Sequence, residues 1–164
     1  MRFSVASTIT GALLLASHAI AAPVTSTASG ESVPQPSISA SIERQAGGFL
    51  SNGPAPPAGG LHSDTITSFQ LIKVNEDAEF VFFSELLSHI ENGTYSLKGH
   101  GEKAKIVNAI KAIQAQELLH SATAAGILAS QGAFVPQPCQ YDFGVTDFKT
   151  AIATADLFTD VVLR

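Results

Sequence analysis

The sequence predicts an all-α protein, an antiparallel bundle of three helices whose third helix is unfinished. Two long segments repeat apolar residues every three or four positions, the spacing that puts them on one face of a helix. Alternating polar and apolar runs, which indicate strands, are scarce. Hydrophobic residues make up 45% of the 164 and charged residues 14%, which favours a buried core over a disordered chain.

Residues 1–21 are predicted to be a signal peptide. Arg2 gives a weakly positive start, an apolar run follows, and Ala19-Ile20-Ala21 is a small-x-small cleavage pattern. The run is shorter than the roughly 20 residues that span a bilayer, so we expect no membrane span. A buried core helix is the alternative, which the following Pro, Ser and Thr residues disfavour. We therefore expect a secreted protein, extracellular or in a cell wall.

Residues 22–61 are rich in Ser, Thr, Pro, Gly and Ala, and they are predicted to be a flexible low-complexity segment. The run from Asn52 to Gly60 holds three prolines and three glycines, which exclude a helix or an inner strand. Within this segment, residues 42–50 are predicted to form a short contact with the rest of the protein.

Residues 62–164 are predicted to be the helical domain. The first helix begins at the caps Ser63 or Asp64 and stops at Asn92-Gly93. The second helix runs from about 102 to 131, before Pro136 and Pro138. Thr146 or Asp147 caps the third helix, whose apolar pattern is still in progress at Arg164.

Each of the first two helices carries one apolar stripe with polar residues at its middle. On the first helix the stripe is Phe69, Ile72, Glu76, Glu79, Phe83, Leu86 and Ile90. On the second helix it is Ile106, Ile110, Ile113, Glu117, His120, Ala124 and Ile127. A short loop joins the helices, so they should be antiparallel neighbours. The register then sets Glu79 beside Glu117 and Glu76 beside His120.

Three carboxylates and an imidazole buried together need compensation, because an uncompensated buried charge costs several kcal/mol. A metal ion supplies it, and mixed oxygen and imidazole ligands suit iron or manganese, with zinc as a further candidate. The di-iron bundles take one Glu from each of two helices and Glu-x-x-His from each of the others. Glu76, Glu79, Glu117 and His120 are half of that set. The alternative is a hydrogen-bonded polar layer, or a solvated face that includes Asp77 and Gln116.

Other features bear on location and partners. The formal charge is −5 and no basic block exists, so a nucleic-acid partner is not expected. Asn92-Gly93-Thr94 is an N-glycosylation sequon, with Asn92 the acceptor in an exported chain. Cys139 is the only cysteine, and it is a free thiol, half of an intermolecular bridge, or the partner of a cysteine in a missing part of the protein. His62, His89 and His100 are interpreted as solvated histidines.

Several segments resemble the fungal secreted ferritin-like proteins, described as late sexual development or stress-response proteins. The resemblance covers about residues 64–164 and rests on Asn75-Glu76-Asp77-Ala78-Glu79-Phe80-Val81-Phe82-Phe83, Gln116-Glu117-Leu118-Leu119-His120, Pro138-Cys139-Gln140-Tyr141-Asp142-Phe143 and Phe158-Thr159-Asp160-Val161-Val162-Leu163. It implies a ferritin-like four-helix fold, a fungal source, and Glu76 or Glu79, Glu117 and His120 as metal ligands. Family members continue into a fourth helix, so this chain looks C-terminally truncated, as a fragment or an incomplete gene product.

The absence of the second half of the di-metal ligand set leads to two expectations. A homodimer related by a two-fold axis can supply the other ligands. The unfinished third helix should also expose apolar surface on Phe148, Ile152, Leu157 and Phe158, which favours association. A different class of function stays open beside metal binding: a non-catalytic extracellular or cell-wall helical module, in which the polar layer only fixes helix register.

Overall fold

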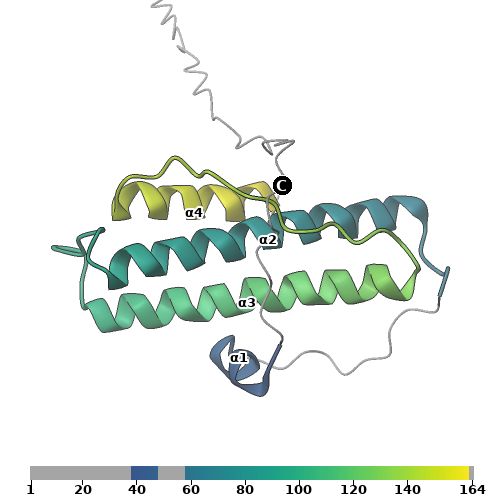
Figure 1. The fold of residues 1–164 in the computed structure, drawn as a ribbon, viewed down its shortest axis with the longest axis horizontal. Coiled ribbons are helices and arrows are strands. Elements are labelled where there is room, and N and C mark those ends of the chain that lie inside the picture. Colours follow the sequence, from purple (N-terminus) through teal and green to yellow (C-terminus); the bar gives the residue numbers. More distant parts are fainter. Residues whose placement is uncertain (1–37, 48–57, 163–164) are drawn as a thin grey trace, which may run out of the picture.

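The computed structural model describes residues 38–47 and 58–162. This part of the chain is all-helical, as predicted, and it contains four helices rather than three: α1 (Ala40–Gln45), α2 (Ser63–Glu91), α3 (Lys103–Ser130) and α4 (Phe148–Val162). The long helices α2 and α3 lie antiparallel along each other, and α4 packs on α2 (Figure 1). The predicted signal peptide and most of the predicted flexible segment lie outside the described residues.

The ends of α2 follow local signals. His62, rather than Ser63 or Asp64, is the N-cap, because its Nδ1 accepts a hydrogen bond of 3.4 Å from the backbone N–H of Asp64. At the other end Gly93 adopts φ +84°, a left-handed conformation that turns the chain out of the helix. The Nζ of Lys103 donates a hydrogen bond of 2.9 Å to the carbonyl of Ile90, where a positive charge complements the helix dipole.

Residues 133–147 form a long crossover that returns along α2. Gln70 Nε2 donates a hydrogen bond of 3.0 Å to the carbonyl of Phe134 near the start of the crossover. Near its end, Tyr95 donates a hydrogen bond of 2.9 Å to the carbonyl of Val145, beyond the C-terminus of α2. The crossover therefore carries the chain back to the end at which α2 connects to α3, so that α4 runs parallel to α3 and antiparallel to α2 (Figure 1).

Asp147 caps α4, as predicted. Its Oδ1 accepts a hydrogen bond of 2.8 Å from the backbone N–H of Thr150, and Thr150 Oγ1 accepts one of 3.3 Å from the N–H of Asp147. This reciprocal arrangement satisfies two backbone donors at the start of the helix. The predicted apolar exposure of α4 is correct for Ile152 and Leu157 but wrong for Phe148, which is 8% exposed, and for Phe158, which packs against the core.

The main core lies where α2, α3, α4 and the crossover meet. Phe82 is at its centre, with its ring edge-on to those of Phe83, Phe143 and Phe158 at centroid distances of 5.1–5.3 Å. Leu86 and Ile90 from α2 and Ile110 from α3 complete the predicted stripes on this side. The stripe is less buried toward the start of α2, where Ile72 is 39% exposed.

The helix α1 is a correction to the predicted flexible segment 22–61. Its residue Ile42 and the following Ala46 pack with Ala115 and Leu119 of α3 in a second, smaller cluster. Gln116 Nε2 also donates a hydrogen bond of 3.0 Å to the carbonyl of Ala46. The predicted contact at residues 42–50 thus corresponds to a helix that starts at Ala40, because apolar side chains one turn apart meet a small apolar face on α3.

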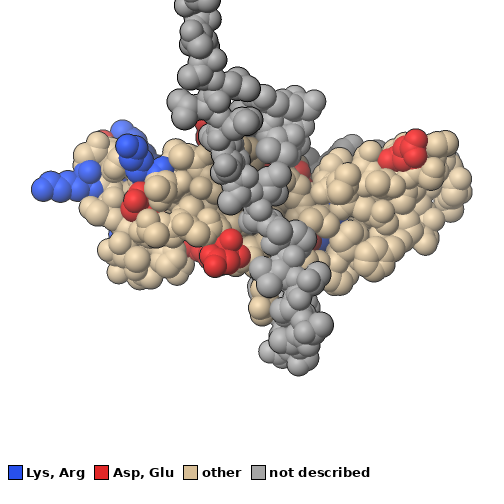
Figure 2. All heavy atoms as spheres, turned by 90° about the horizontal axis from the view of Figure 1, so that it is seen from above, with Lys and Arg blue, Asp and Glu red and all other residues tan. Residues whose placement is uncertain are grey.

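The surface shows one uneven distribution of charge. Figure 2 shows Lys and Arg side chains gathered at the end of the molecule where α2 connects to α3, whereas acidic side chains are spread along that face, including a position beside the basic ones. Lys98, Lys103 and Lys105 belong to this end of the chain. Among helices in the described ranges, none combines the length and apolar character needed to cross a bilayer.

Candidate metal centre

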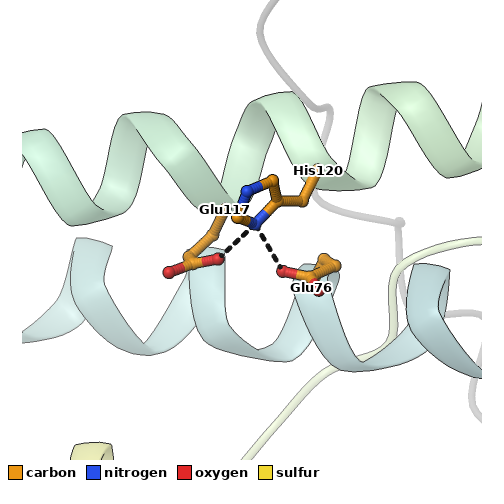
Figure 3. Close-up of side chains that lie close together, drawn as sticks. All are labelled: Glu76, Glu117 and His120. Atoms are coloured by element: carbon orange, nitrogen blue, oxygen red, sulfur yellow. Dashed lines mark hydrogen bonds and ion pairs between the residues drawn. The ribbon is translucent and has the colours of Figure 1, made fainter. Parts of the chain in front are cut away.

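The antiparallel pairing of α2 and α3 brings Glu76 and His120 together, as the predicted register requires. His120 Nδ1 lies 3.3 Å from Glu76 Oε2 on the opposite helix. The same nitrogen lies 3.0 Å from Glu117 Oε2, one turn earlier on its own helix. Figure 3 shows the imidazole directed between the two carboxylates, with both contacts made by one ring nitrogen. The side chains converge because Glu-x-x-His places both of its groups on one helix face.

These three residues form a group with the composition of a metal site. One donor atom from each of Glu76, Glu117 and His120 lies within 4.8 Å of the other two. The carboxylates are buried, at 8% exposure for Glu76 and 9% for Glu117. The His120 side chain is 59% exposed, so the group opens to solvent at its imidazole. The prediction is therefore correct that His120 meets the carboxylates, but wrong that its side chain is buried between apolar residues.

Glu79, the fourth predicted ligand, is buried but stands outside this group of three. Its Oε1 accepts a hydrogen bond of 2.6 Å from Asn75 Nδ2, one turn earlier on α2. Glu79 and Glu117 instead share the wall of a cavity of about 420 Å³, which α2, α3 and α4 line together. Glu79 and Glu117 therefore lie near each other, as predicted, because they line the same cavity, although Glu79 is not one of the three converging residues.

The clustered carboxylates change their acidity. Burial raises the pKa of Glu117 to about 9, and a hydrogen bond to Glu76 and the negative charges of Glu79 and Glu76 add to that rise. Burial also raises the pKa of Glu79, with the charge of Glu76 acting in the same direction. Asn75 and His120 oppose the rise at Glu79. Without a cation, burial and the neighbouring carboxylates therefore favour the protonated form of Glu117 over its charged form.

A second cavity lies on the other side of the cluster along the helix pair. It has a volume of about 320 Å³, and Glu76 and His120 form its polar wall. The rest of its lining is mostly apolar and comes from Phe69, Ile72, Thr123 and Ala124. The cluster therefore has space on both sides, toward the start of α2 and toward α4. A small molecule or a solvent ligand has room to approach either side.

A buried polar group beside the cluster was missed by the sequence analysis. Asp77, which the alternative of a solvated face included, is 1% exposed, and it accepts hydrogen bonds from Lys73 Nζ and from Ser121 Oγ, the latter at 2.7 Å. Lys73 is itself 3% exposed. The signal for this group is the Lys73–Asp77 spacing of four residues, which places an ion pair on one helix face. The apolar stripes alone do not show that this face is covered.

The other singled-out residues lie away from the centre. Cys139 is exposed with a free thiol. His100 is exposed and stands edge-on to Phe148. His89 corrects its prediction as a solvated residue: its Nδ1 is buried without a hydrogen-bond partner among the described residues, and its ring stacks 4.7 Å from that of Tyr95.

Comparison of this chain with protein-family models, with curated proteins and with solved structures gives no match in any of the three. Its function is therefore inferred from the arrangement of its helices and from the geometry of the cluster.

Proposed function

We propose that this chain is a secreted ferritin-like protein that binds an iron or manganese ion through Glu76, Glu117 and His120. The observation that carries the proposal is the convergence of three donor atoms within 4.8 Å, from two antiparallel helices. Two carboxylate oxygens and an imidazole nitrogen suit iron, manganese or zinc better than calcium or copper(I). Glu79 lies beside Glu117 and extends the acidic wall toward α4.

The cluster fits a cation because its own charges are poorly balanced. Glu76 and Glu117 are buried, and the raised pKa of Glu117 reflects a site that disfavours a second negative charge. With a cation bound, Glu117 would give up its proton and offer a carboxylate oxygen. His120 offers Nδ1, the nitrogen that already faces both carboxylates. Its exposure leaves an open side toward the cavity that it lines with Glu76.

Iron or manganese held here supplies Lewis acidity and one-electron redox chemistry. The chain positions the donors on two long helices, which are more rigid supports than loops. Ser121 and Asp77 hold the two helices together one residue further along each of them.

The helix arrangement supports the ferritin-like part of the proposal. Ferritin-like bundles contain one long crossover between two antiparallel helix pairs. Here the α2–α3 hairpin is followed by the crossover at residues 133–147, and α4 starts again at the hairpin end (Figure 1). A simple up-and-down bundle would use a short loop and place α4 antiparallel to α3. The observed order supports the proposal, in which α2, α3 and α4 would be three of the four helices of a ferritin-like bundle.

We extend the proposal to a homodimer that completes the site. Ile152 and Leu157 on α4 are 43% and 38% exposed. Ile152 also lines the cavity whose wall contains Glu79 and Glu117. A second copy placed on this side by a two-fold axis contributes the same donors and covers the apolar residues. Light scattering of the purified protein, with and without manganese, measures the mass that this assembly requires.

Titration of the metal-free protein with Mn²⁺ or, without oxygen, Fe²⁺ tests the central claim. We expect stoichiometric binding by calorimetry, and at least a tenfold loss of affinity in Glu117→Ala and His120→Ala. Glu102→Ala is the matched control, since Glu102 is an exposed carboxylate in the loop before α3 and pairs only with the neighbouring Lys105 among the residues described. Absence of binding, or equal binding by all four proteins, contradicts the proposal.

One observation favours the alternative of a non-catalytic extracellular module. His120 Nδ1 already contacts both carboxylates, and Lys73, Asp77 and Ser121 form a second polar group beside them. Such groups can specify helix register without a ligand. Under this alternative a chelator leaves the melting temperature unchanged and elemental analysis of the purified protein finds no transition metal.

A further inference from the structure

The turn after α2 presents the only Asn-x-Ser/Thr sequence of the chain, Asn92-Gly93-Thr94. Asn92 is the C-cap of α2, and its backbone N–H donates a hydrogen bond of 3.0 Å to the carbonyl of Ser88. Gly93 follows with φ +84°. The backbone N–H of Tyr95 then bonds to the carbonyl of His89 at 2.9 Å, which closes the turn. The sequon is therefore held in one defined conformation at the surface.

The side chain of Asn92 is arranged so that its amide nitrogen is available. Its Oδ1 accepts a hydrogen bond of 2.9 Å from the backbone N–H of Thr94, which forms an Asx-turn. No hydrogen bond to another described residue engages Asn92 Nδ2. Asn92, Gly93 and Thr94 are all exposed, so both the amide and the Thr94 hydroxyl can be reached from outside. A sequon inside a helix or under a packed segment would offer neither group.

The turn is also remote from the candidate metal centre. Asn92 follows Glu76 by sixteen positions, and at about 1.5 Å of rise per residue this places them roughly 24 Å apart along α2. The turn stands at the hairpin end of the molecule, beyond the last turn of α2 (Figure 1). A group attached at Asn92 therefore starts well away from Glu76 along α2.

We propose that Asn92 carries an N-linked oligosaccharide. The Nδ2 atom attacks the anomeric carbon of an oligosaccharide activated as a lipid-linked diphosphate. A C–N bond forms, the bond between the anomeric carbon and the phosphate oxygen breaks, and the lipid diphosphate leaves with the electron pair. One Nδ2 proton passes to a base of the transferase, and nothing is oxidised or reduced. The proposal rests on the export predicted from residues 1–21 and is independent of metal binding.

Expression of the full chain in a eukaryotic secretory host tests this modification. We expect the protein in the medium to exceed its polypeptide mass and to lose the excess after treatment with an amidase that releases N-linked glycans. Asn92→Gln and Thr94→Ala should lose the excess mass completely, whereas Thr94→Ser should keep it because the hydroxyl is retained. Asn108→Gln is the matched control, since Asn108 is exposed on α3 and lies outside any sequon.

Three results overturn the proposal. The first is a secreted chain with no excess mass, and the second is excess mass that persists in Asn92→Gln. The third is retention of the full chain in the cytosol, which would show that it never meets the transferase. A sample in which a host signal peptide precedes residue 22 separates the turn from its own export signal. Absence of the glycan in that sample shows that the turn itself is not an acceptor.

Discussion

Ser121 Oγ on α3 donates a hydrogen bond of 2.7 Å to Asp77 Oδ1 on α2, directly beside the contact of His120 with Glu76. Both contacts cross from α2 to α3 through neighbouring residues on each helix, so both help to hold the two helices in their observed alignment. Asp77 also accepts from Lys73 Nζ, and both of these side chains are almost completely buried. The candidate metal ligands are therefore aligned by a neighbouring group that does not take part in the cluster.

Removal of the Asp77 carboxylate should destabilise the fold strongly. Asp77→Ala leaves the Lys73 ammonium buried without this partner, and such a loss costs about 3–5 kcal/mol of unfolding free energy. The double variant Lys73→Met, Asp77→Leu should cost less, because it removes both charges and keeps most of the volume. Urea denaturation followed by circular dichroism measures both. If Asp77→Ala lowers the free energy of unfolding as little as the exposed control Glu102→Ala does, this ion pair does not hold α2 and α3 in alignment.

Truncation of Phe82 should loosen the crossover and α4 together. Phe82 is 1% exposed and touches Phe143 of the crossover and Phe158 of α4. Phe82→Ala therefore leaves a cavity at the meeting point of three segments, at a cost of about 3–5 kcal/mol. Phe134→Ala is the matched control, because Phe134 is 73% exposed. Equal melting temperatures for the two variants would show that α4 is held by other contacts.

The helices were predictable from the sequence because their ends depend on nearby residues. Asn92-Gly93 stops α2, and Asp147 starts α4 with a side chain that bonds its own backbone. The pairing of Glu76 with His120 was predictable for a related reason. A short connection forces antiparallel neighbours, and the apolar stripes on both helices leave one register. These predictions needed no knowledge of the crossover or of α4.

The predictions that were wrong concern features that depend on contacts between segments distant in sequence. Asp77 and Glu76 are neighbours in sequence and differ by about 100° around the helix, so the stripe does not show whether both faces are covered. The structure buries both. Helix α1 was expected within a flexible segment, and its few apolar residues gain burial only against Ala115 and Leu119 of α3. No pattern within residues 40–45 reports that α3 offers such a face.

The stability of the metal-free protein should fall as the pH rises from about 4.5 to about 9. Burial raises the pKa of Glu117 to about 9 from the ordinary value of 4.5, so the folded chain keeps a proton that the unfolded chain releases in this window. The contribution of this group is complete below the lower value and lost at the upper one. Glu117→Gln mimics the protonated carboxyl and should remove this part of the pH dependence. Urea midpoints at pH 5, 7 and 9 compare the two proteins, and parallel profiles would contradict the assignment.

Metal binding should stabilise the fold through the three residues that converge and less through Glu79. Mn²⁺ at a free concentration of 100 times its Kd adds about 2.7 kcal/mol to the free energy of unfolding. Glu76→Ala, Glu117→Ala and His120→Ala should each lose most of that increment, because each removes a donor from the group within 4.8 Å. Glu79→Ala should keep most of it, since Glu79 bonds to Asn75 and stands outside the group. Denaturation with and without Mn²⁺ measures all four variants. A loss in Glu79→Ala as large as that in Glu117→Ala would show that the ion sits on the α4 side of the cluster, between Glu79 and Glu117, instead of at His120.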